Sequence, residues 1–583
     1  MKIFHNFDSF NEINETMKNL NFIILIFAIL SFNFVYSQTP QIKWWYDVND
    51  SAFGNSASAD LDGDGKLEIA FSCYRNDSTI YVLNAEDGSL LWKVNTGGCN
   101  DAAPLIFDVD MDDTLEVILA GSCVPKTFCF SGPTGEIEWE TPLHGSDSPP
   151  TVGDIDNDGK PEILHGCFGG YVACFNGEDG SVAWDLAVDL NSWIQTAPII
   201  LDVDNNGQLD FVVGNWNFGT DHKIFCFRGN DQYLLWETEL PNDYMYHGAS
   251  FADIDADGYM ELAIGTYDGT LLVLNAENGS LKWEYSFSNP FYIGAPTSIA
   301  DLNNDTIYEI VFFDAWNLGV LSSTGDLLWE FPIPSYAYPF RGAAISDINN
   351  DDTLDVVFGT SNGEVYALHG SSGNEIWSID LAAHHDSVEF DIDHAPIIAD
   401  FDGDSLLDIF VVGGRTDYPE IETNYGRAYA ISCESKGGPD WLMFRKDTVR
   451  SACVKLDTAS MPSNPVYPFD SSSTAFENLN TISIINFESI VKIENNYLIE
   501  TYPNPVSEYL NIEYKLKTKT KVNISLYNYF GLRIADIENS TQKKGSYFKK
   551  LESNFIRNLE NGLYLLKFQF NQQIVVKKLL VQN

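Results

Sequence analysis

Eight short acidic segments recur along the chain, and their residue types are those that bind a hard cation. Each segment begins with Asp at position one and has Asp or Asn at positions three and five, and a fourth acid follows at position nine. Ca²⁺ takes about six to eight oxygen ligands, mainly from carboxylates, amides and backbone carbonyls. The sequence therefore predicts up to eight structural calcium sites. The expected side-chain ligands are Asp60, Asp62, Asp64, Glu68, Asp108, Asp110, Asp112, Glu116, Asp154, Asp156, Asp158, Glu162, Asp202, Asp204, Asn206, Asp210, Asp253, Asp255, Asp257, Glu261, Asp301, Asn303, Asp305, Glu309, Asp347, Asn349, Asp351, Asp355, Asp400, Asp402, Asp404 and Asp408.

Position six of each segment is expected to adopt a left-handed backbone conformation, which glycine reaches without strain. The eight residues there are Gly65, Asp113, Gly159, Gly207, Gly258, Thr306, Asp352 and Ser405. Threonine suits this conformation least, so the segment that begins at Asp301 should be the weakest site. An EF-hand closes with Glu at position twelve and enters a helix. Here strand-forming residues follow position nine, which excludes that fold.

The charge balance points the same way. The chain has 84 Asp and Glu against 33 Lys and Arg, for a net charge of −51. Nucleic acid is excluded as a partner because a polyanion requires a basic surface. Carboxylates packed this closely repel one another unless a cation neutralises them, so we expect calcium to stabilise the fold.

A tryptophan repeats with the same period of about 50 residues as the acidic segments. The eight tryptophans are Trp92, Trp139, Trp184, Trp236, Trp283, Trp329, Trp377 and Trp441. Each repeat contains four short apolar runs separated by turns, which is typical of a propeller blade. The sequence predicts an all-β protein whose residues 38–453 form an eight-bladed β-propeller, with seven blades as the alternative. Trp44-Trp45 is expected to add an outer strand that closes the ring.

Two family resemblances follow from these motifs, and both cover about residues 42–453. The acidic segments, each followed by a strand, resemble FG-GAP repeats, the integrin-α type of blade, which implies calcium on the lower face. The stretch YVLNAEDGSLLW at 81–92 and its copies resemble the PQQ-type blade, which implies tryptophan docking between blades. Neither resemblance implies catalysis by itself.

The two ends of the chain indicate export. Residues 1–37 are interpreted as a signal peptide, with Met17 as an alternative start, and no transmembrane segment is expected in the mature protein. Residues 454–500 are interpreted as a linker. Residues 501–583 resemble the type A C-terminal sorting domain of the type IX secretion system, on the motifs YPNP (502–505), ISLYNYFG (524–531), NGLYLLKF (561–568) and KKLLV (577–581). The resemblance implies a small β-sandwich, handling by the type IX machinery, and a Gram-negative protein that is secreted or attached to the outer-membrane surface.

The nine cysteines leave an odd thiol in a chain bound for an oxidising compartment. Cys129, Cys174 and Cys226 share one register in three repeats and are expected to be buried free thiols. Pairing of Cys99 with Cys123 or with Cys73 remains open.

No catalytic residue is assigned, because no G-x-S-x-G, H-E-x-x-H or Cys/His nucleophile pair is present. The favoured hypothesis is a glycan- or protein-binding adhesion module, and not an enzyme. Its expected ligand platform, on the face opposite the acidic segments, consists of Trp193, Trp216, Tyr267, Trp316 and Arg341, beside Tyr246, Tyr292, Phe340, Asp101, Gln195, His247 and His394. Alternatively, these aromatic residues only fill gaps between loops. Two other functions stay open: a polysaccharide lyase resembling rhamnogalacturonan lyase, and a purely structural surface protein.

Overall fold

The structure is a computed structural model. It describes residues 40–217, 221–240, 243–386, 389–417, 421–433, 435–436, 439–441, 498–502, 509–528, 533–551, 553–556, 559, 562–570 and 573–581. The expected signal peptide, 1–37, and the expected linker, 454–500, lie outside these residues, except that a strand begins at Leu498. No helix among the described residues is long and apolar enough to span a membrane.

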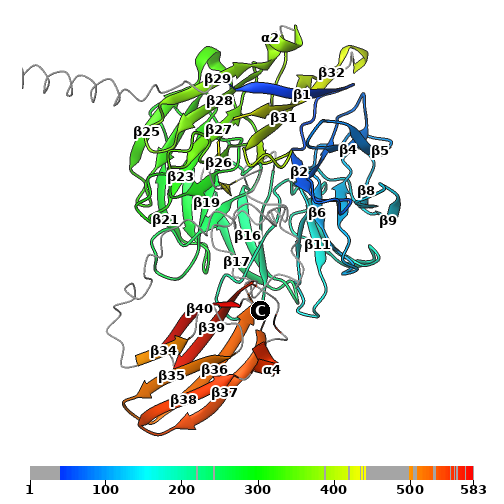
Figure 1. The fold of residues 1–583 in the computed structure, drawn as a ribbon. Helices are drawn as coiled ribbons and strands as arrows, with labels where there is room; N and C mark the ends of the chain where they lie inside the picture. The colour runs from blue at the N-terminus through cyan, green and yellow to red at the C-terminus, as the bar shows by residue number, and fades with distance from the viewer. Residues whose placement is uncertain are drawn as a thin grey trace, which may run out of the picture. The chain divides into compact units, whose positions relative to one another are not determined.

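Eight antiparallel sheets, each forming one blade, follow one another in the described part of residues 41–441 (Figure 1). Blade one contains β2 (Ser56–Ala59), β3 (Glu68–Ser72), β4 (Thr79–Asn84) and β5 (Leu90–Asn95). Blade two contains β6 (Leu105–Phe107), β7 (Glu116–Ala120), β8 (Lys126–Ser131) and β9 (Ile137–Pro142). Blade three contains β10 (Thr151–Gly153), β11 (Glu162–Cys167), β12 (Tyr171–Asn176) and β13 (Val182–Ala187). Blade four contains β14 (Ile199–Leu201), β15 (Asp210–Gly214), β16 (Lys223–Arg228) and β17 (Leu234–Glu239). Blade five contains β18 (Ser250–Ala252), β19 (Glu261–Gly265), β20 (Leu271–Asn275) and β21 (Leu281–Tyr285). Blade six contains β22 (Ser298–Ala300), β23 (Glu309–Asp314), β24 (Asn317–Leu321) and β25 (Leu327–Pro332). Blade seven contains β26 (Ala344–Ser346), β27 (Asp355–Gly359), β28 (Glu364–His369), β29 (Glu375–Asp380) and β33 (Pro439–Trp441), and blade eight contains β30 (Ile397–Ala399), β31 (Asp408–Arg415), β32 (Tyr425–Ser432) and β1 (Gln41–Val48).

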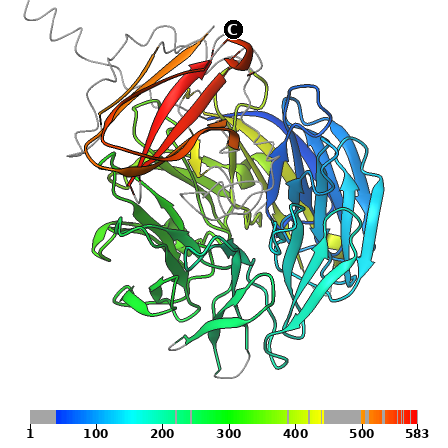
Figure 2. The ribbon, with the colours of Figure 1, turned by 90° about the horizontal axis from the view of Figure 1, so that it is seen from below.

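The first strands of the blades surround the central axis. Neighbouring first strands contact one another, among them β2 with β6, and β2 with β30 where the ring closes. Figure 2 follows the blades around the ring from blue through green to yellow. The second strands, such as β7, are buried on both faces and are therefore continuous apolar runs. The fourth strands, such as β9, have partly exposed and fully exposed positions, as expected for the outer edge of a blade.

The repeated tryptophans dock each blade onto the next, which explains why they recur with the period of the blades. The indole Nε1 of Trp92 donates to the carbonyl oxygen of Gly132 in the following blade, at 2.6 Å. The ring packs on Gly135, where a Cβ atom would lie 2.5 Å from the indole, so the turn requires glycine as well as a positive φ of 69°. The same indole-to-carbonyl bond joins Trp44 to Ala85, Trp139 to Gly177, Trp236 to Ala276, Trp283 to Ser323 and Trp329 to Gly370.

The N-terminal strand closes the ring, as the Trp44-Trp45 pair predicts. β1 pairs with β32 and becomes the outer strand of blade eight, so Trp44 docks onto blade one. Our assignment of Trp441 as the eighth outer-strand tryptophan is therefore wrong. Trp441 lies in β33, which pairs with the axial strand β26 of blade seven.

The C-terminal strands form two sheets. One has the order β34 (Leu498–Tyr502), β35 (Leu510–Leu516) and β38 (Gly545–Leu551), and the other β37 (Arg533–Gln542), β36 (Thr520–Asn528), β39 (Gly562–Phe570) and β40 (Gln573–Val581). Leu510 and Ile512 of the first sheet share one buried cluster with Val522 and Phe568 of the second, as in a β-sandwich. Short helices are η1 (Pro334–Tyr336), α2 (Leu381–His385), η2 (Ile421–Thr423) and α4 (Ser553–Ile556).

Of the two alternatives for the disulfide, the structure contains Cys99–Cys123. Cys129, Cys174 and Cys226 are buried free thiols, as expected.

Candidate functional site

The acidic segments connect the first and second strands of every blade, on the face that we call the lower face. Position nine is the first residue of the second strand, as Glu68 is in β3. A carboxylate oxygen of Glu68 accepts a hydrogen bond from the backbone nitrogen of Leu61, at position two, at 2.7 Å. The same bond occurs in all eight segments, so this acid closes each loop on itself.

Position six has a positive φ in all eight segments, as predicted, and its backbone nitrogen donates to the carboxylate of position one. Thr306 takes this conformation with a φ of 72°. Position four is left-handed as well, which the sequence did not lead us to expect. Its residues are Gly63, Met111, Asn157, Asn205, Ala256, Asn304, Asn350 and Gly403.

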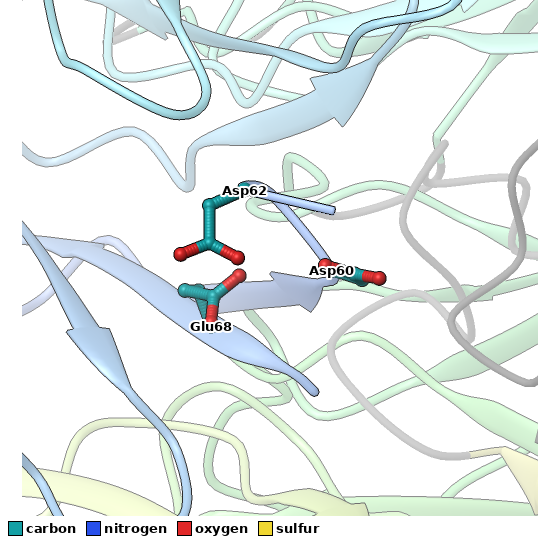
Figure 3. A group of neighbouring side chains, drawn as sticks. All are labelled: Asp60, Asp62 and Glu68. Atoms are coloured by element: carbon teal, nitrogen blue, oxygen red, sulfur yellow. The ribbon is translucent and has the colours of Figure 1, made fainter. Parts of the chain in front are cut away.

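The loops bring carboxylates together at positions one, three and nine. One oxygen from each of Asp60, Asp62 and Glu68 lies within 4.8 Å of the others, and Figure 3 shows Asp62 and Glu68 facing one another beside Asp60. Equivalent groups form in the next four segments: Asp108, Asp110 and Glu116; Asp154, Asp156 and Glu162; Asp202, Asp204 and Asp210; and Asp253, Asp255 and Glu261. These groups could hold a metal ion.

The predicted ligand at position five is not part of these groups. In every segment its side-chain oxygen accepts from the backbone nitrogen at position seven, as Asp64 does from Lys66 at 2.9 Å. This residue therefore shapes the turn, and its role as a ligand stays a prediction.

Two observations indicate that the loops suit a cation. Asp210 is fully buried, and its Oδ1 has no hydrogen-bond partner among the described residues, although Oδ2 accepts from Val203. Burial, with the neighbouring aspartate charges, raises the pKa of Glu68, Glu116 and Glu162 to about 8. A cation among these groups would satisfy the unpaired oxygen and favour the charged carboxylates.

The opposite face, the upper face, contains a cavity of about 320 Å³ at the end of the axis. Its lining residues come from blades on several sides of the ring: Phe53, Tyr74, Asp101, Tyr246, Tyr338, Phe340, Arg341, Asp393 and Thr416. Several of them directly precede the first strands β6, β18, β26 and β30, which surround the axis. The cavity is therefore a shared mouth of the ring.

Arg341 is the central charge of this cavity and is 4% exposed. Its NH2 donates to Asp101 Oδ1 at 2.7 Å, and its NH1 lies 3.0 Å from His247 Nδ1. The guanidinium also lies 5.6 Å from the ring centre of Phe340. Arg341 and His247, which we expected on one platform with Phe340, are thus in direct contact.

Buried carboxyl groups outnumber this one guanidinium. Burial raises the pKa of Asp393 to about 6, and burial with the Asp101 charge raises the pKa of Asp147 to about 7. Burial also raises the pKa of Asp101, although Arg341 opposes the shift. Asp393 Oδ1, Gln195 Oε1 and Arg341 Nε are buried without a partner among the described residues. Buried polar atoms are nearly always hydrogen-bonded, so these atoms are candidates for contact with a ligand or water.

A continuous row of aromatic rings, the aromatic belt, crosses blades three to six beside the cavity. It runs through Phe168, Trp193, Trp216, Tyr244, Tyr267, Tyr292, Phe291 and Trp316, with neighbouring ring centres 4.5–5.8 Å apart. Tyr246 joins the belt to the cavity, 5.0 Å from Trp216 and 5.4 Å from Phe340. Except for Phe291, which is 51% exposed, the belt residues from Trp193 to Trp316 are half-buried. The structure thus connects all five predicted platform residues.

Sequence reasoning missed Asp147 and Asp393 in the cavity region and Tyr244 and Phe291 in the belt. A signal for the two aspartates was present. Both stand four residues before a first strand, the place that Asp101 and Gln195 occupy in their own blades.

Comparison with known families identifies two parts of the chain. Residues 500–582 match the family described as secretion system C-terminal sorting domain. This domain implies handling by the type IX secretion machinery and a secreted or cell-surface protein. Residues 76–192 and 170–431 match the PQQ-like family described as outer membrane protein assembly factor BamB. No curated protein sequence matches the chain.

Similar solved structures include the Vibrio cholerae biofilm matrix protein Bap1, with 14% identity and a TM-score of 0.52 over 70% of this chain and 93% of Bap1. Saccharomyces cerevisiae Sqt1 is 12% identical, with a TM-score of 0.50 over 68% of this chain and 99% of Sqt1. BamB from Moraxella catarrhalis is 17% identical, with a TM-score of 0.39 over 57% of this chain and 84% of BamB. At these identities the first two likenesses show the fold alone.

Proposed function

Because the chain belongs to the PQQ-like repeat family described as outer membrane protein assembly factor BamB, whose fold fixes no single activity, we propose its function from the two faces of the ring. The chain is a secreted propeller that calcium stabilises on its lower face. It binds a neutral saccharide on its upper face and serves as an adhesion module. The aromatic belt that leads into a cavity with unsatisfied buried polar atoms is the observation that supports this proposal.

The belt has the properties of a sugar-binding surface. Half-buried aromatic rings offer flat apolar faces on which the C–H faces of a sugar ring can stack, and their fixed positions limit the entropy lost on binding. Asp101, Asp393 and Arg341, in the cavity beside the belt, supply acceptors and donors for hydroxyl groups. A row of aromatic rings that runs beside a polar cavity, joined to it by Tyr246, suits an oligosaccharide that lies along the belt with one residue in the mouth.

The charges favour a neutral ligand over a polyuronate. Arg341 is engaged by Asp101, and Asp147 and Asp393 add further buried carboxyl groups near it. A negatively charged polysaccharide would meet net repulsion there. The lyase hypothesis, which requires cleavage of an acidic pectin-like chain, is for this reason less favoured.

On the lower face, calcium is the cation that fits the loops best. The donors are hard carboxylate oxygens, which Ca²⁺ prefers, whereas thiolate and imidazole ligands suit Zn²⁺. The ions would hold the turns between first and second strands and take no part in ligand chemistry.

The test is a glycan-binding screen of the secreted full chain with neutral and acidic oligosaccharides, in calcium and in chelator. We expect binding to neutral glycans, and Trp216→Ala and Trp316→Ala should each weaken it about tenfold, for a stacking contribution of about 1.4 kcal/mol. Tyr233→Ala is the matched control, because Tyr233 is 61% exposed and lies outside the belt. Chelator should weaken binding by loosening the fold. Glycan binding that survives both tryptophan changes would refute the belt, and selective binding of cationic peptides would identify a protein ligand instead.

A further inference from the structure

One strand position faces the acidic segment of its own blade. It is the residue that directly precedes the docking tryptophan on the outer strand. In blade five this residue is Lys282, before Trp283 on β21, and in blade eight it is Lys43, before Trp44 on β1. At the six other positions stand Leu91, Glu138, Ala183, Leu235, Leu328 and Ile376.

The two lysines place an ammonium group among the carboxylates. Lys282 Nζ lies 2.5 Å from Asp255 Oδ2 and 2.9 Å from Glu261 Oε1. Lys43 Nζ lies 2.6 Å from Asp402 Oδ2 and 2.8 Å from Asp408 Oδ2. The partners are the residues at positions three and nine, two of the three positions that converge in blades one to five.

In blade five the lysine completes the hydrogen bonds of the acid at position nine, whereas in blade eight Lys43 bonds the Oδ2 of Asp408 that Phe401 already uses, and Oδ1 has no partner among the described residues. In blade five, Glu261 Oε2 accepts from Ile254 and Oε1 accepts from Lys282, so both oxygens are satisfied. In blade four the equivalent Asp210 has one oxygen on Val203 and its other oxygen, fully buried, has no partner among the described residues. Leu235 stands at the strand position there.

In blade two a carboxylate holds this position. Glu138 on β9 occupies it, and burial together with the charges of Asp110 and Asp112 raises the pKa of Glu138. A carboxylate here adds to the negative charge around the segment, whereas a lysine neutralises part of it.

We propose that Lys43 and Lys282 are built-in cations that replace calcium in blades eight and five, so that these two loops fold without metal and the remaining loops bind Ca²⁺. The inference rests on the proposed calcium function of the loops. A divalent ion bound by the same carboxylates would lie about as close to the ammonium as an ion pair, where like charges repel strongly. The ion and the lysine therefore exclude one another.

The location of Lys43 gives the replacement a consequence for folding. Lys43 belongs to β1, and its partners belong to the segment that leads into β31, so the pair ties the N-terminal strand to the blade that it completes. The ring can thus close before calcium is available.

The experiment counts bound calcium by native mass spectrometry of the full chain, equilibrated with about 10 mM Ca²⁺, above the dissociation constants of about 10⁻⁴–10⁻³ M of extracellular modules. With eight segments and two lysines, the wild type should bind at most six ions. Lys43→Met and Lys282→Met should each gain one ion. Leu235→Met, at the same strand position of blade four, should leave the count unchanged.

Thermal unfolding gives a second readout. In chelator, Lys282→Met should melt below the wild type, and calcium should restore its melting temperature. If the wild type binds calcium and neither lysine variant changes the number of bound ions, the lysine inference alone is overturned. A wild type and variants that all bind none would refute the calcium function, and the absence of rescue by calcium would then overturn the inference as well.

Discussion

Replacing Trp92 with phenylalanine should destabilise the propeller more than the same change at Trp377. The two side chains are matched, since they hold equivalent positions on outer strands and are 7% and 4% exposed. They differ in one interaction. Trp92 Nε1 donates to Gly132 at 2.6 Å, whereas the buried Trp377 Nε1 has no partner among the described residues.

The difference follows from how the ring closes. Trp377 faces blade eight, whose third strand, β32, is paired with β1 from the N-terminus. The third-to-fourth-strand hairpin that receives the tryptophan in other blades is therefore interrupted. Both substitutions remove a similar amount of apolar ring. Only Trp92→Phe leaves the buried carbonyl of Gly132 unpaired, at a cost of about 1–3 kcal/mol.

Urea unfolding of the full chain in calcium measures this difference. With a dependence of about 3 kcal/mol per molar urea, the midpoints of the two variants should differ by about 0.3–1 M, with Trp92→Phe lower. Equal midpoints, or a lower midpoint for Trp377→Phe, would show that docking depends on ring packing and not on the indole hydrogen bond.

Two further predictions concern the acidic segments. In chelator, the free energy of unfolding should fall as the pH rises from about 4.5 to about 8, because folded Glu68 and Glu116, with pKa values raised to about 8, keep protons that the unfolded chain releases. Calorimetry across this pH range measures the slope, which calcium should abolish. A flat profile in chelator would contradict the reasoning. Thr306→Gly should stabilise the protein by about 1 kcal/mol, because threonine holds a φ of 72° there. Asp352→Gly is the control: aspartate tolerates this conformation, so the same thermal scans should show a smaller increase in stability. An equal increase in both variants would show that Thr306 is not strained.

The periodic features were predictable because each blade repeats the same local physics. The spacing of Asp60 and its copies indicated the turns, and the tryptophan period indicated the docking. Trp441 misled because it keeps the period in sequence while β1 takes its structural place. The sequence around Trp441 does not indicate that β1, some 400 residues away, completes blade eight.

The cavity and the built-in lysines were harder to predict for a related reason. Asp393 belongs to the site because the segments that precede blades seven and two, far from it in sequence, place Arg341 and Asp101 beside it. Lys282 becomes a cation for its segment only when β21 pairs within the blade and carries it to Glu261. Such contacts depend on tertiary placement, which residue spacing along one segment does not encode.

The two faces of the ring differ in how strictly they repeat, and this difference bears on function. On the lower face, positions one and nine are acidic in all eight blades, as expected where every loop has the same task. On the upper face, the residues four positions before the first strands are of six types, with aspartate three times: Ala52, Asp101, Asp147, Gln195, Tyr246, Gly294, Phe340 and Asp393. A ring whose blades are joined by repeated tryptophan docking contacts has no structural need for such variety at its mouth. An asymmetric set of donors, acceptors and rings around one axis is what a ligand without rotational symmetry requires, and this supports a binding role for the upper face over a purely structural one.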